Sequence, residues 1–323
     1  MENNENINYL ISFSSTRICL AQSIQDKDLE DNENSLLWKI SGNGLQHDSY
    51  LLGTMHNVER TFLDSISGFK KAFKTAKQIA IECDIYAWDN QKKSLSQYVY
   101  MPQNTTYLSL YNDSDYQFVD SILRKGNPRY FKYKPIFWCT FFSSMIIYQN
   151  IRGKEMGMDR FILKIGYQNN KEICFMETLE EVNERTAYLD SLRYSLNLQY
   201  QAAALKAILQ YPDSILDKMN LTSQIYKEQN MSGLITITSS INKNADFLTL
   251  DNIQDETKQY LYKSQKHSFE ILGKLRNEKW MKNILPMIHK DSSLIAVGAA
   301  HLIGADGLIA KLRNLGYKVE PIK

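Results

Sequence analysis

The spacing of apolar residues predicts a hairpin, a helix and a buried strand in the first part of the chain. Residues 36–54, LLWKISGNGLQHDSYLLGT, hold two apolar runs around a Gly-Asn-Gly turn, which is typical of a β-hairpin. From Asp64 to Lys77 apolar residues recur at helical spacing, with Asp64 placed to cap the start. The run QIAIEC, from Gln78 to Cys83, predicts the strand that follows.

This order of strand, helix and strand predicts a parallel βαβ unit. In such a unit the functional residues gather at the carboxyl ends of the strands. His56 follows the strand that ends near Gly53, and Glu82 closes the next strand. We therefore expect both side chains at the same edge of one sheet.

The middle of the chain begins with an aromatic-rich helical stretch from Asp113 to Asn150. Breaks are predicted at Asn127-Pro128 and before Pro135, and we interpret the stretch as a wall or lid. Its most apolar run, Pro135 to Tyr148, is shorter than the roughly 20 residues that a bilayer-spanning helix needs. The run predicts a buried helix or a membrane-facing lid, and the sequence shows no transmembrane segment.

Residues 153–190 predict a further unit with a helix, a short strand and a charged helix. Gly157-Met158-Asp159 opens the first helix, Glu172 to Met176 forms the strand, and Glu177 begins the second helix. Residues 191–290 are predicted to be a helical insertion, which is broken at Pro212 and near the β-branched run from Leu234 to Thr238.

The last segment predicts a buried strand from Ser293 to Gly298, a loop that carries His301, a helix from Leu308 to Leu315 and a final strand. Together the elements predict an α/β (α+β) fold in which a mixed β-sheet is flanked by helices. Residues 35–323 are expected to form a single domain with a helical insertion at about 191–290.

Two tetrads share the pattern of a strand followed by Gly-x-x-His, namely Gly53-Thr54-Met55-His56 and Gly298-Ala299-Ala300-His301. They predict two related halves that each present one imidazole at a strand end. The glycines are expected to let the chain turn sharply, so that the imidazoles point across the edge of the sheet. Imidazole nitrogens and a carboxylate suit a divalent ion, so His56, Glu82 and His301 are candidate metal ligands.

Other polar residues could carry the chemistry or serve simpler roles. Glu177 could be a ligand, a general base or the first-turn glutamate that helix N-termini favour. Glu82, and Asp84 beside it, could instead be carboxylates at a strand end in water. Arg276 and Asn277 could stabilise an oxyanion and position substrate, although most such pairs are surface residues.

Composition excludes some functions. The 323 residues carry 38 Lys and Arg against 36 Asp and Glu, a net charge of +2, which gives no overall field that would attract nucleic acid or an anionic membrane. The four cysteines are widely spaced and form no disulfide framework, so we interpret them as mostly buried thiols. Residues 1–34 are predicted to be a disordered tail or a degenerate signal segment, because Glu2 and Glu5 stand where a secretory signal needs positive charge.

These residues together resemble the TraB/GumN/TIKI family, related to erythromycin-esterase and ChaN-like proteins. The resemblance covers most of 36–100, 153–190 and 270–323 and is carried by LLWKISGNG, SYLLGTMH, IAIECD, GMDRFI, FMETLEEV, LRNEKW and AVGAAHLIGADGLIAKLRNLGY. It implies a mixed sheet with a site at one edge, His56 and His301 as the motif histidines, Glu82 as the strand-end glutamate, and Arg276-Asn277 as the family's pair. Asp159 and Glu177 match two further blocks.

The resemblance further implies a metal-dependent hydrolase, a metallopeptidase acting on peptides or on the amino-terminal regions of proteins. Mn²⁺ or Co²⁺ is the favoured ion, with Zn²⁺ or Fe²⁺ as alternatives. Glu82, Glu177, Arg276 and Asn277 are the candidate catalytic residues. The alternative functions are a peptide-binding protein that does not cut, and a haem- or iron-binding protein like ChaN. The resemblance favours export to the periplasm or medium, and a cytoplasmic location is the alternative.

Overall fold

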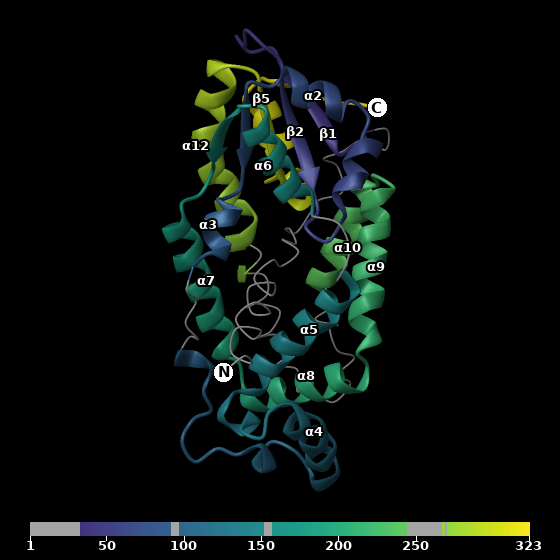
Figure 1. Cartoon of the computed structure of the whole chain (residues 1–323), viewed down its shortest axis with the longest axis vertical. Coiled ribbons are helices and arrows are strands. Elements are labelled where there is room, and N and C mark those ends of the chain that lie inside the picture. Colours follow the sequence, from purple (N-terminus) through teal and green to yellow (C-terminus); the bar gives the residue numbers. More distant parts are fainter. Residues whose placement is uncertain (1–32, 92–96, 152–156, 244–266, 269) are drawn as a thin grey trace.

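The computed structural model describes residues 33–91, 97–151, 157–243, 267–268 and 270–323. Within these residues a sheet of six strands runs in the order β4-β3-β5-β2-β1-β6. The sheet lies toward one end of the elongated molecule, and helices form the other end (Figure 1). The strands are β1 (Leu37–Ser41), β2 (Ser49–Thr54), β3 (Gln78–Ile81), β4 (Glu172–Phe175), β5 (Ser293–Gly298) and β6 (Lys318–Pro321). The sheet is mixed, as the sequence predicts.

The first two strands form the expected hairpin. β1 and β2 pair antiparallel, and the turn between them places Gly42, Asn43 and Gly44 at positive φ. Glycine and asparagine adopt this backbone conformation with little strain, which explains why the Gly-Asn-Gly cluster marks the turn.

β5 lies between β2 and β3, and pairs in parallel with both. Thr54 is opposite Gly298, and Ile81 is opposite Ala296, so the carboxyl ends of the three strands meet at one edge. The prediction that β2 and β3 run in the same direction is confirmed. The apolar β5, buried along nearly its whole length, takes the central position between them.

Helices cover the sheet at close range. α6 (Met158–Gln168) packs against β3 and β4, and Gly166 permits the approach, since a Cβ there would lie 2.8 Å from Ile173 Cδ1 and 3.0 Å from Ile79 Cδ1. The other helices near the sheet are α2 (Phe69–Thr75), α3 (Ile85–Asp89), α12 (Lys274–Lys290), α13 (Leu308–Asn314) and the short 3₁₀ helices η1 (Arg60–Ser65) and η5 (Ala299–His301).

The far end of the molecule has an aromatic core of its own, separate from the core under the sheet. Tyr107 meets Tyr130 edge-on with ring centroids 4.9 Å apart, and Trp138 packs in the same cluster. The helices with side chains in this core are α4 (Asp113–Gly126), α5 (Pro135–Ile151), α7 (Leu179–Tyr194), α8 (Leu198–Gln210), η2 (Gln97–Val99), η3 (Tyr107–Ser109) and η4 (Tyr130–Lys132). Two further helices, α9 (Asp213–Lys227) and α10 (Met231–Lys243), contribute Tyr226 and Met231 to the core under the sheet. The predicted breaks at Asn127-Pro128 and Pro135 fall between α4 and α5. None of the helices in the described part of the chain is long and apolar enough to span a bilayer.

Two local predictions are wrong. Asp64 does not cap a helix, because α2 begins only at Phe69, after the left-handed Gly68, and Asp64 pairs with Lys70 instead. The β-branched run from Leu234 lies inside α10, where burial of Leu234 outweighs a weak helix propensity. The proposed signal or tail in residues 1–32 lies outside the described residues.

Candidate functional site

The candidate residues meet at the carboxyl edge of the sheet. His56 follows β2, Glu82 directly follows β3, and His301 ends η5 after β5. Three more come from neighbouring segments: Glu177, Arg276 and Asn277. All six therefore surround one region, although their positions in the sequence span most of the chain.

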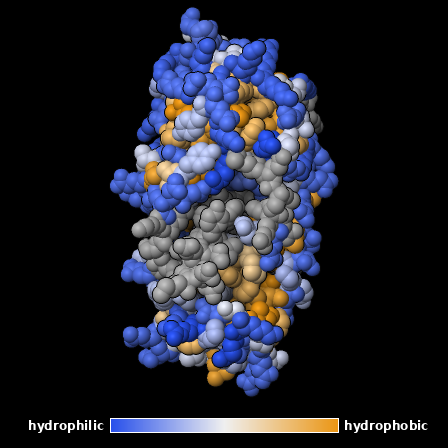
Figure 2. Space-filling model, in the orientation of Figure 1, coloured by the Kyte–Doolittle hydropathy of each residue, from blue (hydrophilic) through white to orange (hydrophobic). Residues whose placement is uncertain are grey.

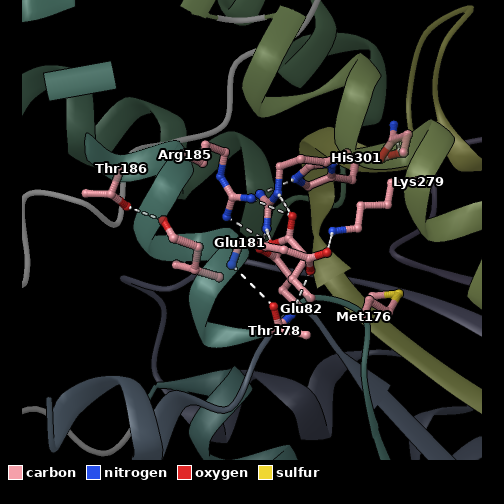
Figure 3. A network of polar contacts seen from close by, with 12 residues as sticks. Glu82, Met176, Thr178, Glu181, Arg185, Thr186, Lys279 and His301 are labelled. Atoms are coloured by element: carbon pink, nitrogen blue, oxygen red, sulfur yellow. Dashed lines mark hydrogen bonds and ion pairs between the residues drawn. The ribbon is translucent and has the colours of Figure 1, made fainter. Parts of the chain in front are cut away.

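Arg276 is the centre of this region. Its guanidinium donates to Glu82 Oε2 at 2.7 Å, and to Glu177 at 2.7 and 3.0 Å. Its remaining terminal nitrogen lies 3.1 Å from His301 Nε2. Figure 3 shows the network of polar contacts that includes Glu82, Arg185 and His301. The guanidinium also stacks on Trp280, with 4.4 Å between its central carbon and the ring centroid. A planar group with several donors in a fixed fork can satisfy all these partners together.

Glu177 is held by two arginines. Besides Arg276, Arg185 on α7 donates to both of its oxygens, at 2.6 and 2.9 Å. The side chain is only 1% exposed. The interpretation of Glu177 as a first-turn helix glutamate is wrong, because α7 begins after Thr178, whose hydroxyl and Glu181 form the capping box.

The hydrogen bonds around His301 fix its tautomer. Asn277 Nδ2 donates to the carbonyl oxygens of His301 and Asp306, so its Oδ1 must accept the 2.7 Å bond from His301 Nδ1. Nε2 is then the nitrogen with the lone pair, and it accepts from Arg276. Burial, followed by the nearby guanidinium, lowers the pKa of His301 to about 3, so the ring is neutral.

His56 is held in the opposite charge state. Its Nδ1 donates to Asp159 Oδ2 at 2.7 Å, and Thr54 Oγ1 donates to the other oxygen of that buried carboxylate at 2.6 Å. Loss of solvent lowers the pKa of His56, but the Asp159 carboxylate outweighs this effect and raises it to about 9. Within the described residues, no hydrogen bond occupies Nε2, and the side chain is 43% exposed.

Glu82 is ionised at any ordinary pH. Burial alone would raise its pKa, yet Arg276, the two histidines and the Gly298 N–H, which donates at 2.9 Å, hold it well below the usual value. Burial raises the pKa of the adjacent Cys83 to about 12, so its thiol stays protonated. Asp84 caps α3 by accepting from the Ala87 N–H, which places it in a structural role.

Neither glycine of the two Gly-x-x-His tetrads forms a sharp turn, and Gly53 serves close packing instead. Gly53 lies within β2, and Gly298 has φ −52, a conformation open to any residue. A Cβ at Gly53 would lie 3.1 Å from Ala299 Cα, so this position lets the two histidine loops approach one another. The expectation of sharp turns at these glycines is wrong.

The residues present fit a divalent ion in the type of donor atom that they offer. Each imidazole is held through Nδ1, by Asp159 or by Asn277, which is how metal-binding histidines are commonly oriented. Within the described segments, however, no group of three His, Cys, Asp or Glu side chains is arranged to hold an ion. Arg276 already bonds to Glu82 and His301, so an ion shared by the three candidates requires the guanidinium to move.

Arg185 is a site residue that no sequence motif distinguishes. It is one of many charged residues along α7, and its position eight residues after Glu177 matches no motif. Asp159 could be recognised as a candidate only from the sequence block GMDRFI that contains it. Its partners Thr54 and His56 lie more than 100 residues away in the chain, so no local pattern links them.

Comparison with known proteins gives one match. The sequence model of the TraB/PrgY/gumN family matches residues 36–321. No curated protein and no solved structure matches the chain.

Proposed function

This chain belongs to the TraB/PrgY/gumN family, and from that premise we propose that it is a metal-dependent hydrolase that cleaves amide bonds in peptides or in the amino-terminal regions of proteins. The observation that best supports this proposal is that His56, Glu82 and His301 follow the carboxyl ends of three adjacent parallel strands. Catalytic sites of α/β sheets lie at this edge.

The proposed ligands are the Nε2 atoms of His56 and His301 and the carboxylate of Glu82. A bound Mn²⁺, Co²⁺, Zn²⁺ or Fe²⁺ would polarise a scissile carbonyl and make a water more acidic. Asp159 and Asn277 would keep the two imidazoles in the tautomer that offers Nε2.

Arg276 is proposed to stabilise the oxyanion that forms when the amide carbonyl is attacked. A guanidinium in a buried site stabilises negative charge strongly, because little water screens it. While bonded to Glu82 and His301 it cannot serve this role fully, so the proposal requires it to exchange these partners for the substrate. Glu177 and Arg185 would anchor the guanidinium during that exchange.

The two glutamates are unequal candidates for moving a proton. Glu177 already accepts four hydrogen bonds from arginine donors, which favours a holding role. Glu82 has a pKa far below neutrality while Arg276 is bonded to it, so it is a weak proton acceptor in this arrangement. Glu82 becomes a better base once the guanidinium has moved away.

The test is mass spectrometry of a peptide library incubated with the protein and each of the four metal ions. We expect cleavage that EDTA stops, that Glu82→Gln abolishes, and that the exposed control His47→Ala leaves unchanged. Intact peptides with every ion would contradict the proposal.

A second candidate is a protein that captures peptides without cutting them. It is favoured by the bonding of Arg276 to two of the three proposed ligands, which leaves the site satisfied without an ion. Tight binding of peptides that emerge intact, with or without metal, would select this function.

A further inference from the structure

A second surface lies far from the sheet, on the loops that connect α3 to α4 and α4 to α5. Four large apolar side chains are exposed there: Tyr98 at 46%, Tyr100 at 48%, Leu108 at 57% and Phe131 at 50%. Exposed apolar side chains are unremarkable when scattered, but a cluster indicates an interaction site.

Backbone contacts hold the two loops together. Met101 N–H donates to the Lys132 carbonyl at 2.9 Å, and Lys134 N–H donates to the Val99 carbonyl at 2.8 Å. The Tyr100 and Tyr133 rings stack 5.5 Å apart. The exposed side chains therefore project from one ordered platform, which we call the basic-aromatic surface.

The charged side chains of the two segments that form this surface, residues 97–112 and 124–134, are all of one sign. Residues 97–112 contain no charged side chain, and residues 124–134, RKGNPRYFKYK, contain five cations and no acid. Arg124 is paired with Asp120, and Lys134 donates to the Tyr194 carbonyl. The others, Lys125, Arg129 and Lys132, are exposed and form no ion pair within the described part of the chain. The net charge of +2 for the whole chain conceals this local excess.

We propose that the basic-aromatic surface binds the headgroup region of an anionic phospholipid bilayer. Tyrosine rings favour the depth of the headgroups, Leu108 and Phe131 would enter the boundary of the acyl chains, and the three cations would meet lipid phosphates. Leu108, the most exposed of the four, has no ring on which a base could stack, which favours lipid over nucleic acid.

The place of this surface in the molecule suits peripheral binding. It belongs to the end that holds α4, opposite the end at which α2 covers the sheet (Figure 1). At that lower end of the view, strongly polar and apolar residues lie side by side (Figure 2). The proposal does not depend on metal binding or on hydrolysis at the sheet edge.

The test is co-sedimentation of the full chain with phosphatidylcholine vesicles, with and without phosphatidylserine. We expect binding only when phosphatidylserine is present, and weaker binding as salt is raised. Combined Lys125→Ser, Arg129→Ser and Lys132→Ser should reduce affinity on the order of a hundredfold, from about fivefold per cation. The matched control combines Lys71→Ser, Lys74→Ser and Lys77→Ser, three exposed lysines beside the sheet, and should bind as the wild type does.

A second pair of variants tests the apolar part. Leu108→Ser with Phe131→Ser should lose binding, whereas Leu221→Ser with Leu315→Ser, both also 50% exposed, should retain it. Circular dichroism checks that each variant is folded. Failure to sediment with phosphatidylserine vesicles, equal losses in the control variants, or retention of a single-stranded oligonucleotide in place of vesicles would overturn the proposal.

Discussion

At the scale of single residues, each buried charge in the candidate site lies next to a charge of opposite sign. Arg276 and Arg185 are matched by Glu82 and Glu177, while protonated His56 is matched by Asp159. A buried charge that loses its partner is strongly destabilising, because neither water nor an opposite charge then compensates it. The site is therefore sensitive to the removal of any single charge.

Glu177→Gln should lower the free energy of unfolding by about 3–5 kcal/mol, because it leaves two arginines without their shared carboxylate. Urea denaturation of both proteins measures the change. The matched control is Glu181→Gln, whose carboxylate is 37% exposed and pairs with Lys279, and the expected loss there is about 1 kcal/mol or less. Equal losses in the two variants would contradict the buried network.

The two site histidines should give the metal-free protein a stability maximum near pH 6.5. The pKa of His301 is lowered to about 3, so below its ordinary value of 6.5 the unfolded chain takes up a proton that the folded chain refuses. Stability then falls with acidification by up to about 1.4 kcal/mol per pH unit. The pKa of His56 is raised to about 9, so its contribution is complete below pH 6.5 and is lost as pH rises toward 9.

Urea unfolding midpoints of EDTA-treated protein across this pH range measure the profile. His301→Gln should flatten the slope between pH 6.5 and the pH near 4.5 at which carboxylates begin to titrate. An unchanged acid slope in this variant would show that His301 is not the neutral buried group described above.

Sequence alone could place His56, Glu82 and His301 at the edge of a sheet, because each follows an apolar run that forms a strand. It could not establish that Arg276, Asn277 and Glu177 are buried, since their partners other than Arg185 lie 24 to 194 positions away. Arginine and glutamate are ordinarily surface residues, and only the assembled fold shows that each has a partner.

At the scale of elements, the contact between the two histidine loops organises the site. Gly53 in β2 lies against Ala299 in η5, and a Cβ at position 53 would lie only 3.1 Å from Ala299 Cα. This contact joins the end of β2 to the end of β5, the two strands from which the imidazoles project. Because the nearest atoms include the backbone Cα of Ala299, the neighbour cannot move aside as the end of a flexible side chain would.

Gly53→Ala should therefore destabilise the fold by about 1–3 kcal/mol through overpacking. Thermal or urea unfolding measures the change. Gly126→Ala is the matched control, because nothing lies within 4 Å of a Cβ at that end of α4, and it should be neutral or stabilising by up to about 1 kcal/mol. Tolerance of alanine at both positions would contradict a tight contact between the loops.

Most elements could be predicted from local pattern, and the exceptions have physical causes. The turn at Gly42–Gly44 and the break at Pro128 follow from the backbone preferences of glycine, asparagine and proline, which can be read from the residue types alone. The late start of α2 depends on Gly68, where a Cβ would lie 2.7 Å from Ile322 Cγ2 near the other end of the chain. No local pattern contains that contact.

At the scale of the whole molecule, the order of the strands was the least predictable feature. β5 separates β2 from β3 although some 200 residues lie between it and either of them in the chain. Hydrophobic periodicity identifies a strand but does not choose its neighbours. The predicted position of His56 and Glu82 at the same edge of one sheet is confirmed, because β2, β3 and β5 all run in the same direction.

Calorimetric titration of Mn²⁺ into EDTA-treated protein tests whether His56, Glu82 and His301 share one ion. We expect binding by the wild type and by His47→Ala, an exposed control histidine, and loss of binding in both His56→Ala and His301→Ala. Wild-type affinity in either of the last two variants would contradict it.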